Sequence, residues 1–454
     1  MSAEGAAAQL LRGLQDLAQT PANDALYDVV RLRLLDGLGC LLAGGALMRA
    51  QRGRGQTLLR LSAGEGPVPV VGFGRRADPK TAALINGMSC HIAELDDGHR
   101  YGITHAGAVV LPALISTLHH PDLTEQSFLR ALLLGYEAAI RMGCSLQPMA
   151  KDQGWHGTGM FGCIGAAIGV ATALGASPAQ MNAALSAGAS GASGLLAVIR
   201  GASDLKPYNC GQAAQAGLSA GLVAMAGFAG AADVLGGAQG LLDILSGPAA
   251  PDLDQLTVAA PYCVETVYLK PYASCRYAHA PIEAALSLRN AHGIAPDQIA
   301  RVHVSTYRLA VYQHDHTEIH GPGSARMSVP YCVAAALISG ETGMAAFGDA
   351  MLRDAATLDL TRRVQVVEDP ALTALIPARR PAVVTLHLTS GQSLSARVDL
   401  PKGEPETAMS PAELRTKFTD LAQFAGYQPE AAGQMADQLL DPDAPKLPLI
   451  RALS

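Results

Sequence analysis

The feature that most limits the fold of this chain is a set of three segments, residues 166–174, 181–198 and 213–231, that consist largely of Ala and Gly. Gly weakens a helix that stands alone. When such helices are buried, however, their small side chains let neighbouring helices approach closely. The three segments therefore predict a compact helical core.

Regularly spaced apolar residues extend this helical part toward the N-terminus. Apolar side chains recur at helical spacing over residues 26–42 and again over 129–142. Between them we expect one short extended element at 68–73, followed by another helix that begins near Pro79. The first half of the chain is therefore predicted to be helical.

The pattern changes after Pro261, where β-branched or alternating segments appear. These predicted strands are residues 264–269, 302–307, 364–367, 383–388 and 394–400, and the turn Ser390-Gly391 joins the last two as a hairpin. Helical patterns lie between the strands at 280–290 and 329–337. Helices are also predicted at 411–425 and 429–440. We expect a second, α+β domain, and a C-terminal tail that returns to the helical one.

Composition narrows the function. Only 16% of the 454 residues are charged and the net charge is −6, without a basic block, so we expect neither nucleic acid nor a membrane as partner. The N-terminus lacks the cationic stretch followed by an apolar one that is typical of a secretory signal, which favours a cytoplasmic protein. The eight cysteines are scattered without a C-x-x-C pair, which favours reduced thiols. Nucleotide-binding, zincin and serine-hydrolase motifs do not occur. A small molecule is the expected partner.

Five polar segments are embedded in apolar or Gly-rich surroundings, where a charged group is costly unless it has a partner or a function. They are residues 91–107, 155–162, 204–211, 270–279 and 324–331. The first segment places ionisable side chains, Asp96, His99 and His105 among them, between two apolar stretches, which indicates the wall of a cleft. Alternatively, Asp96 caps a helix and His105 is a satisfied core histidine.

The other four segments contain candidate ligand-binding side chains. His156 precedes glycines that allow a helix N-terminus to approach a ligand, although a histidine in such a turn is more often structural. Lys206 and Lys270 each begin a Lys-Pro-Tyr sequence at a break between elements. Together with Arg276 they can bind an anion that bears several carboxylates, or each lysine can lie at the surface. Tyr331 begins an apolar helix and is either a cleft hydroxyl or a core tyrosine.

A histidine-rich tract at residues 313–320 has the residue types of a metal site. In an exposed loop such a tract is usually solvated, and nothing in its spacing fixes a coordination geometry. We therefore predict that the protein binds no metal.

Taken in order, these segments resemble the signature of the MmgE/PrpD family, which includes 2-methylcitrate dehydratase, cis-aconitate decarboxylase and iminodisuccinate epimerase. The resemblance rests on AALING at 82–87, ELDDGH at 94–99, HAG at 105–107, LPA at 111–113, KPYNCGQAA at 206–214, KPYASCRYAH at 270–279 and SVPY at 328–331. It covers nearly the whole chain. It implies a mainly α fold, with a large all-helical domain of residues 1–264 and 401–454, a smaller α+β domain of residues 265–400, and an active site between them. It also implies a homodimer that uses no metal or organic cofactor.

The resemblance also supplies a candidate site. Matching positions make His105, His156, Asp96 and Tyr331 the candidate catalytic residues and Lys206, Lys270, Arg276, Cys275 and His99 the candidate substrate-binding residues. In this hypothesis the cationic side chains bind substrate carboxylates, the two catalytic histidines transfer the proton, the aspartate orients a histidine, and the tyrosine donates to a leaving hydroxyl or a developing enediolate.

The expected activity is a cofactor-independent lyase reaction on a small di- or tricarboxylate, with proton abstraction next to a carboxylate. Dehydration of a 2-methylcitrate-like hydroxy acid is the first expectation. Decarboxylation of the cis-aconitate type and epimerisation of the iminodisuccinate type are the alternatives. A different class, a non-catalytic carboxylate-binding protein, is disfavoured because paired histidines add nothing to simple anion binding.

Overall fold

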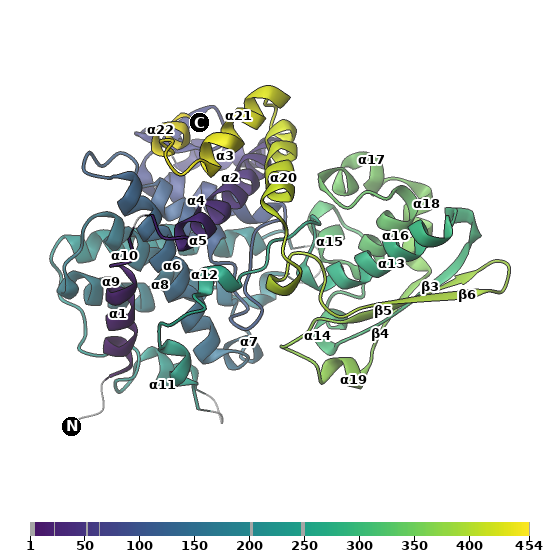
Figure 1. Ribbon diagram of the computed structural model, residues 1–454, viewed down its shortest axis with the longest axis horizontal. Helices are drawn as coiled ribbons and strands as arrows, with labels where there is room; N and C mark the ends of the chain where they lie inside the picture. Colours follow the sequence, from purple (N-terminus) through teal and green to yellow (C-terminus); the bar gives the residue numbers. More distant parts are fainter. Residues whose placement is uncertain are drawn as a thin grey trace.

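The computed structural model describes residues 5–21, 23–50, 53–62, 64–199, 203–246 and 250–453. Its two parts are seen in Figure 1, where helices fill one side and a small sheet with its own helices lies on the other. The chain is mainly helical with a small mixed sheet in its C-terminal region, as the sequence predicts. Within the described residues, every helix is too short or too polar to cross a membrane.

The helical part contains the Ala- and Gly-rich segments. Its helices are α1 (Ala6–Leu17), α2 (Leu26–Ala50), α3 (Arg54–Ser62), α4 (Pro79–Ile92), α5 (Gly107–Ile115), α6 (Glu125–Leu146), α7 (Met149–Asp152), α8 (Gly157–Ala173), α9 (Pro178–Ser190), α10 (Lys206–Met225), α11 (Leu241–Leu245) and α12 (Cys263–Thr266). A two-stranded antiparallel sheet of β1 (Val68–Val70) and β2 (Arg75–Ala77) lies beside them.

Glycine sets the distance between neighbouring core helices. A Cβ atom at Gly87 of α4 would lie 2.8 Å from the Cα atom of Gly211 of α10, and one at Gly211 would lie 2.3 Å from the carbonyl oxygen of Leu84. Gly135 of α6 and Gly165 of α8 approach each other's backbone in the same way. The small residues that weaken an isolated helix therefore permit backbone contact between buried ones.

The smaller part is a four-stranded sheet with helices on one face. Its elements are α13 (His279–His292), β3 (Ile299–Thr306), α14 (Arg308–Val311), α15 (Pro322–Met327), α16 (Val329–Ser339), α17 (Asp349–Leu352), α18 (Ala355–Arg362), β4 (Val364–Glu368), α19 (Pro370–Thr373), β5 (Ala382–Leu388) and β6 (Ser393–Val398). The strand order is β4-β3-β5-β6, with β3 and β4 parallel and the other pairs antiparallel. α13 and α16 pack against this sheet.

The C-terminal helices return to the helical part, as Figure 1 shows in yellow. They are α20 (Pro411–Phe424), α21 (Pro429–Leu440) and α22 (Leu447–Ala452). α20 and α21 both pack against α2. This arrangement supports the division that we propose, with residues 1–264 and 401–454 in one domain and 265–400 in the other.

Three of the expected elements differ in detail from the structure. The helix expected over 213–231 ends at Met225. The helix expected over 181–198 ends at Ser190 with Gly191 as its C-cap, after which Gly194 adopts a positive φ of 119° and the chain forms a short 3₁₀ turn at Leu196–Ile199. Of the strand expected over 264–269, residues 264–266 belong instead to the short helix α12, in which the Glu265 carboxylate accepts a hydrogen bond from the Tyr262 backbone N–H, and Tyr268 forms only an isolated bridge to Gly98. Local capping decides the structure of that apolar run.

Candidate active site

A cavity of about 450 Å³ lies where the two parts of the chain meet. The helical part lines it with the N-terminal ends of α8 and α10 and with the segment that follows α4. The smaller part contributes Tyr268, residues 275–277, 308–309 and 312–314, Met327 and Arg380. Residues more than 280 positions apart in the sequence thus share one concave site, as ligand sites between domains commonly do.

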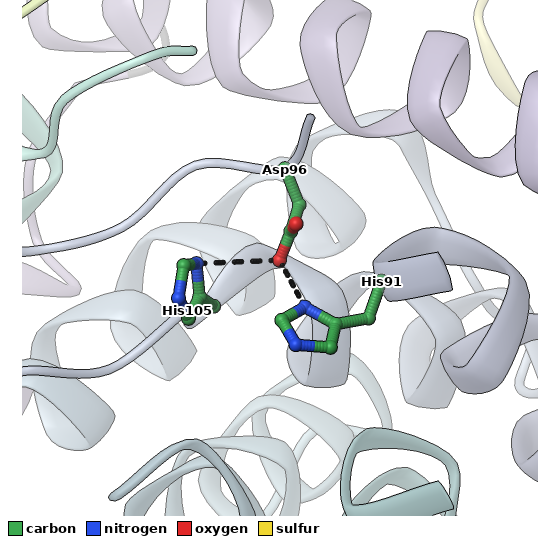
Figure 2. Close-up of side chains that lie close together, drawn as sticks. All are labelled: His91, Asp96 and His105. Atoms are coloured by element: carbon green, nitrogen blue, oxygen red, sulfur yellow. Dashed lines mark hydrogen bonds and ion pairs between the residues drawn. The ribbon is translucent and has the colours of Figure 1, made fainter. Parts of the chain in front are cut away.

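Asp96 holds two histidines at this site, as Figure 2 shows. Its Oδ2 atom lies 2.7 Å from His91 Nδ1 and 3.3 Å from His105 Nδ1. His91 belongs to the last turn of α4, and Glu94 then turns the chain back with a positive φ of 54°. Burial alone would raise the pKa of Asp96, but His91 and Lys270 hold it well below its usual range. Asp96 is therefore a carboxylate that orients both rings.

Glu94 forms a second charged centre with two buried lysines. Its Oε1 atom accepts a short hydrogen bond from Lys206 Nζ, and its Oε2 atom lies 3.4 Å from Lys270 Nζ. Lys270 is fully buried and also lies 3.6 Å from Asp96 Oδ1. Burial by itself would lower the pKa of both ammonium groups, but the neighbouring carboxylates raise it above the ordinary value. Both lysines are therefore charged at neutral pH.

Two of the histidines that line the cavity, His105 and His156, have opposite hydrogen-bonding roles. His105 Nδ1 donates to the backbone carbonyl of Asp97, which leaves Nε2 with a lone pair. The Asn209 side chain donates from Nδ2 both to His156 Nδ1, at 3.2 Å, and to the carbonyl of Leu195, so the proton of His156 is on Nε2. Burial lowers the pKa of His105 to about 3 and that of His156 well below its usual range. One neutral ring can therefore accept a proton while the other can donate one.

The ligand atoms of His91, Asp96 and His105 lie within 4.8 Å of one another, which is compatible in distance with a metal ion. The chemistry of the group does not suit one. Both Nδ1 atoms face the carboxylate as N–H donors, and the ammonium of Lys270 lies beside the same carboxylate. In the histidine-rich tract, His314 Nδ1 bonds the carbonyl of Tyr312 whereas His316 Nε2 bonds that of Ser324, so these two rings have separate partners.

The other candidates divide into two groups. Cys275 and Arg276 line the cavity, but the Arg276 guanidinium is paired with Glu404, and Arg276 Nη2 lies 2.9 Å from Glu404 Oε1. The structure does not place Tyr331, His99, Asp96 or Lys270 at the cavity wall, although the last two contact the wall residues His105 and Glu94. The Tyr331 hydroxyl donates to the carbonyl of Ala346, and the His99 ring bonds the Thr266 hydroxyl and the backbone of Gly102.

Four further side chains belong to the site although the sequence argument did not select them. They are His91, Glu94, His314 and Arg380. The first two lie three residues apart inside the quoted 91–107 segment, where their i, i+3 spacing was the available signal. Arg380 had no signal of that kind. Its guanidinium stacks over the ring of Tyr268 and donates to a backbone carbonyl, and it forms no close ion pair with a carboxylate of the described residues, although Glu404 acts on it electrostatically.

Comparison with known proteins connects this site to a family. The family model for the MmgE/PrpD N-terminal domain matches residues 9–254, and the model for the MmgE/PrpD C-terminal domain matches residues 272–441. A cis-aconitate decarboxylase of Aspergillus terreus is 24% identical over 451 residues, covering 92% of this chain and 89% of that protein. A second one, from another strain, is 25% identical over 446 residues with the same coverage. The cis-aconitate decarboxylase-like protein oryM of Aspergillus oryzae is 31% identical over 172 residues, which cover 36% of this chain and 35% of that protein.

Proposed function

The chain belongs to the MmgE/PrpD family, and we propose that it is a cofactor-independent lyase that acts on a small di- or tricarboxylate by proton transfer at a carbon next to a carboxylate. The observation that carries this proposal is the pair of neutral histidines with opposite hydrogen-bonding roles, His105 and His156, in one cavity. A protein that only binds an anion has no use for such a pair.

The charges around the cavity favour a substrate with several carboxylates. Basic side chains outnumber acidic ones among the lining residues, with Lys151, Lys206, Arg276, Arg308 and Arg380 against Glu94 and Asp152. Arg276 is already paired with Glu404, so we assign the main carboxylate contact to Arg380, whose planar guanidinium suits bidentate binding. Lys206 contributes a second positive charge at the N-terminal end of α10.

Proton transfer is assigned to His105 and His156. His105 Nε2 carries the lone pair and acts as the base, whereas His156 Nε2 carries the proton and acts as the donor. Asp96 orients His105, and the interaction between the carboxylate and the ring becomes more favourable once the ring is protonated. The positive charges of Lys206 and Lys270 stabilise the negative charge that develops next to the substrate carboxylate.

Among the possible reactions, decarboxylation of a cis-aconitate-like unsaturated tricarboxylate is the first candidate. The two long relatives are named cis-aconitate decarboxylases and align over 92% of this chain. Loss of CO₂ leaves an electron pair on the carbon chain, delocalised into a neighbouring carboxylate, and one carbon must then take up a proton. The N–H of His156 and the ammonium of Lys206 are the available donors.

Dehydration of a 2-methylcitrate-like hydroxy acid is the second candidate. It is favoured by one observation, the unprotonated Nε2 of His105, because a dehydratase must first remove a proton from carbon. In that reaction the hydroxyl leaves with a proton from a donor on the other side, and His156 is again the candidate.

A panel assay separates these reactions. The purified protein is incubated with cis-aconitate, citrate, 2-methylcitrate and iminodisuccinate while proton NMR follows the carbon skeleton and a coupled assay follows CO₂. We expect CO₂ release from cis-aconitate, and we expect it to be lost in His105→Ala and His156→Ala but retained in His387→Ala, which removes a half-buried histidine of β5 outside the cavity. Water loss from a hydroxy acid without CO₂ would select the second candidate. Binding of these acids without any turnover would refute the proposed function.

A further inference from the structure

A thiol and an imidazole lie together on the cavity wall, apart from the group around Asp96. Cys275 Sγ is 3.5 Å from His314 Nε2, and the other nitrogen of that ring, Nδ1, is 2.8 Å from the carbonyl of Tyr312. Both residues line the cavity, and neither is used in the proton transfer assigned above. A thiol beside a base that is oriented by a third group is the arrangement of an activated sulfur nucleophile.

Charged and neutral titratable groups on several elements face this sulfur. The charged ones and the histidine are His314 after α14, Lys206 at the start of α10, Lys270 on the same segment and Glu94 after α4, and the neutral titratable ones are Tyr307 after β3 and Cys332 on α16. Burial would raise the pKa of the Cys275 thiol, but His314 and Lys206 outweigh it and bring the pKa down to about 7. A large fraction of this thiol is therefore ionised at neutral pH.

Cys144 shows that a neighbouring histidine alone does not have this effect. It is also half-buried, and its sulfur lies 3.6 Å from His99 Nδ1. Yet burial raises the pKa of Cys144 to about 12, because Arg141 nearby is offset by Glu137 and Asp252. The other six cysteines are buried. Cys275 is thus distinguished from the other seven by its environment and by its access to the cavity.

We propose that the Cys275–His314 pair is a covalent modification site that adds to unsaturated carboxylates held in the cavity. In this step the thiolate sulfur forms a bond to the β-carbon of an α,β-unsaturated acid and the π electrons move to the carbon next to the carboxylate. That carbon then takes up the proton that the thiol released, so no oxidant or other reactant is needed. The basic cavity wall binds the carboxylate and raises the local concentration of the alkene at the sulfur.

The choice of alkene rests on the proposed function, because both candidate reactions produce an unsaturated carboxylic acid. The modification would therefore slow the enzyme as product accumulates, by occupying the cavity with a covalent adduct. The chemistry of the pair does not depend on which reaction the enzyme catalyses.

The test uses the full-length protein and two reagents. Methylenesuccinate, an unsaturated dicarboxylate, is the probe for addition, and saturated methylsuccinate is its matched control. Iodoacetamide, which is neutral, reports the reactivity of the thiol between pH 5 and 10 without carboxylate binding. Intact mass and peptide mapping are applied to the wild type, Cys275→Ser, Cys144→Ser and His314→Gln, each checked by thermal melting.

We expect a methylenesuccinate adduct on Cys275 in the wild type and in Cys144→Ser, none in Cys275→Ser, and none with methylsuccinate. Iodoacetamide should label Cys275 with a midpoint near pH 7, which follows from its pKa of about 7, and His314→Gln should move that midpoint to higher pH. Absence of the methylenesuccinate adduct on Cys275, equal labelling of Cys144, or a wild-type iodoacetamide midpoint near the ordinary thiol value would each overturn the inference. Labelling without turnover of any acid would refute only the proposed function, whereas turnover without labelling would refute only this inference.

Discussion

Replacement of Lys270 by methionine tests how the buried charges of the site are balanced. The Nζ atom lies 3.4 Å from Glu94 Oε2 and 3.6 Å from Asp96 Oδ1, and the side chain is fully buried. At an effective dielectric constant of about 20, each contact is worth about 4–5 kcal/mol of Coulomb energy. Desolvation of the ammonium offsets several kcal/mol of that sum. Because the variant leaves two carboxylates without this partner, we expect a net loss of about 3–5 kcal/mol in the free energy of unfolding.

The loss of unfolding free energy in Lys270→Met should depend on pH. In the wild type the lowered pKa of Asp96 stabilises the fold above the pKa of the unfolded chain, and this contribution disappears as pH falls. In Lys270→Met the pKa of Asp96 rises toward or above its ordinary value, so protonation at mildly acidic pH relieves the uncompensated charge. The difference in unfolding free energy between wild type and variant should therefore be larger at pH 7.5 than at pH 5.

Urea denaturation followed by circular dichroism at both pH values measures this difference. Arg415→Met is the matched control, because it removes an equally well-formed ion pair to Asp437 at the exposed surface and should cost much less at either pH. If Lys270→Met unfolded at the same urea concentration as the wild type at pH 7.5, the assignment of Lys270 as the buried counter-ion of this site would be wrong.

The remaining predictions concern binding, catalysis and pH. His105→Ala should lower kcat by about 10²- to 10⁴-fold while calorimetry still detects substrate binding, and a normal kcat in a folded variant would contradict its role as the base. Arg380→Met should raise KM by about 30- to 1,000-fold with little effect on the melting temperature. Arg276→Met should instead lower the melting temperature, because it removes an ion-pair partner of buried Glu404. The opposite pattern in steady-state kinetics and melting would assign the carboxylate contact to Arg276. Activity should survive dialysis against a chelator, and restoration of a lost activity by one divalent ion would show that the site holds a metal. Burial lowers the pKa of His99 to about 3, below its unfolded value, so the fold should lose stability as pH falls from about 7 to about 3, and His99→Gln should reduce that loss in pH-dependent urea titrations.

Local pattern was sufficient for most of the fold. The spacing of apolar residues predicts α2, α6 and α13, and the β-branched runs predict β3 to β6, because those signals depend on a few neighbouring residues. It failed at residues 264–269, where an apolar run that resembles a strand has its first three residues in a helix. There the deciding interaction is a backbone cap made by Glu265, which hydropathy does not register.

The site was less predictable because its decisive contacts are distant in sequence. Arg276 is a reasonable candidate for binding a carboxylate until Glu404, 128 residues later, is seen to occupy it. Tyr331 lies in a polar segment, yet its hydroxyl is bonded to a backbone carbonyl in the core. Arg380 stands next to no recognisable motif and reaches the cavity only because the end of the chain segment before β5 is folded against Tyr268. In each case the sequence contains the polar group but does not show its partner.

The glycine contact between α4 and α10 has a consequence for how such enzymes diverge. His91 lies at one end of α4 and Lys206 at the start of α10, so the separation of the two helix axes sets the distance between the polar side chains that project from them. A single methyl group at Gly211 would meet the backbone of Leu84 and push the helices apart. Reaction specificity can therefore drift through substitutions that alter no polar side chain, and libraries meant to change the substrate have reason to sample small residues at helix crossings as well as the cavity wall.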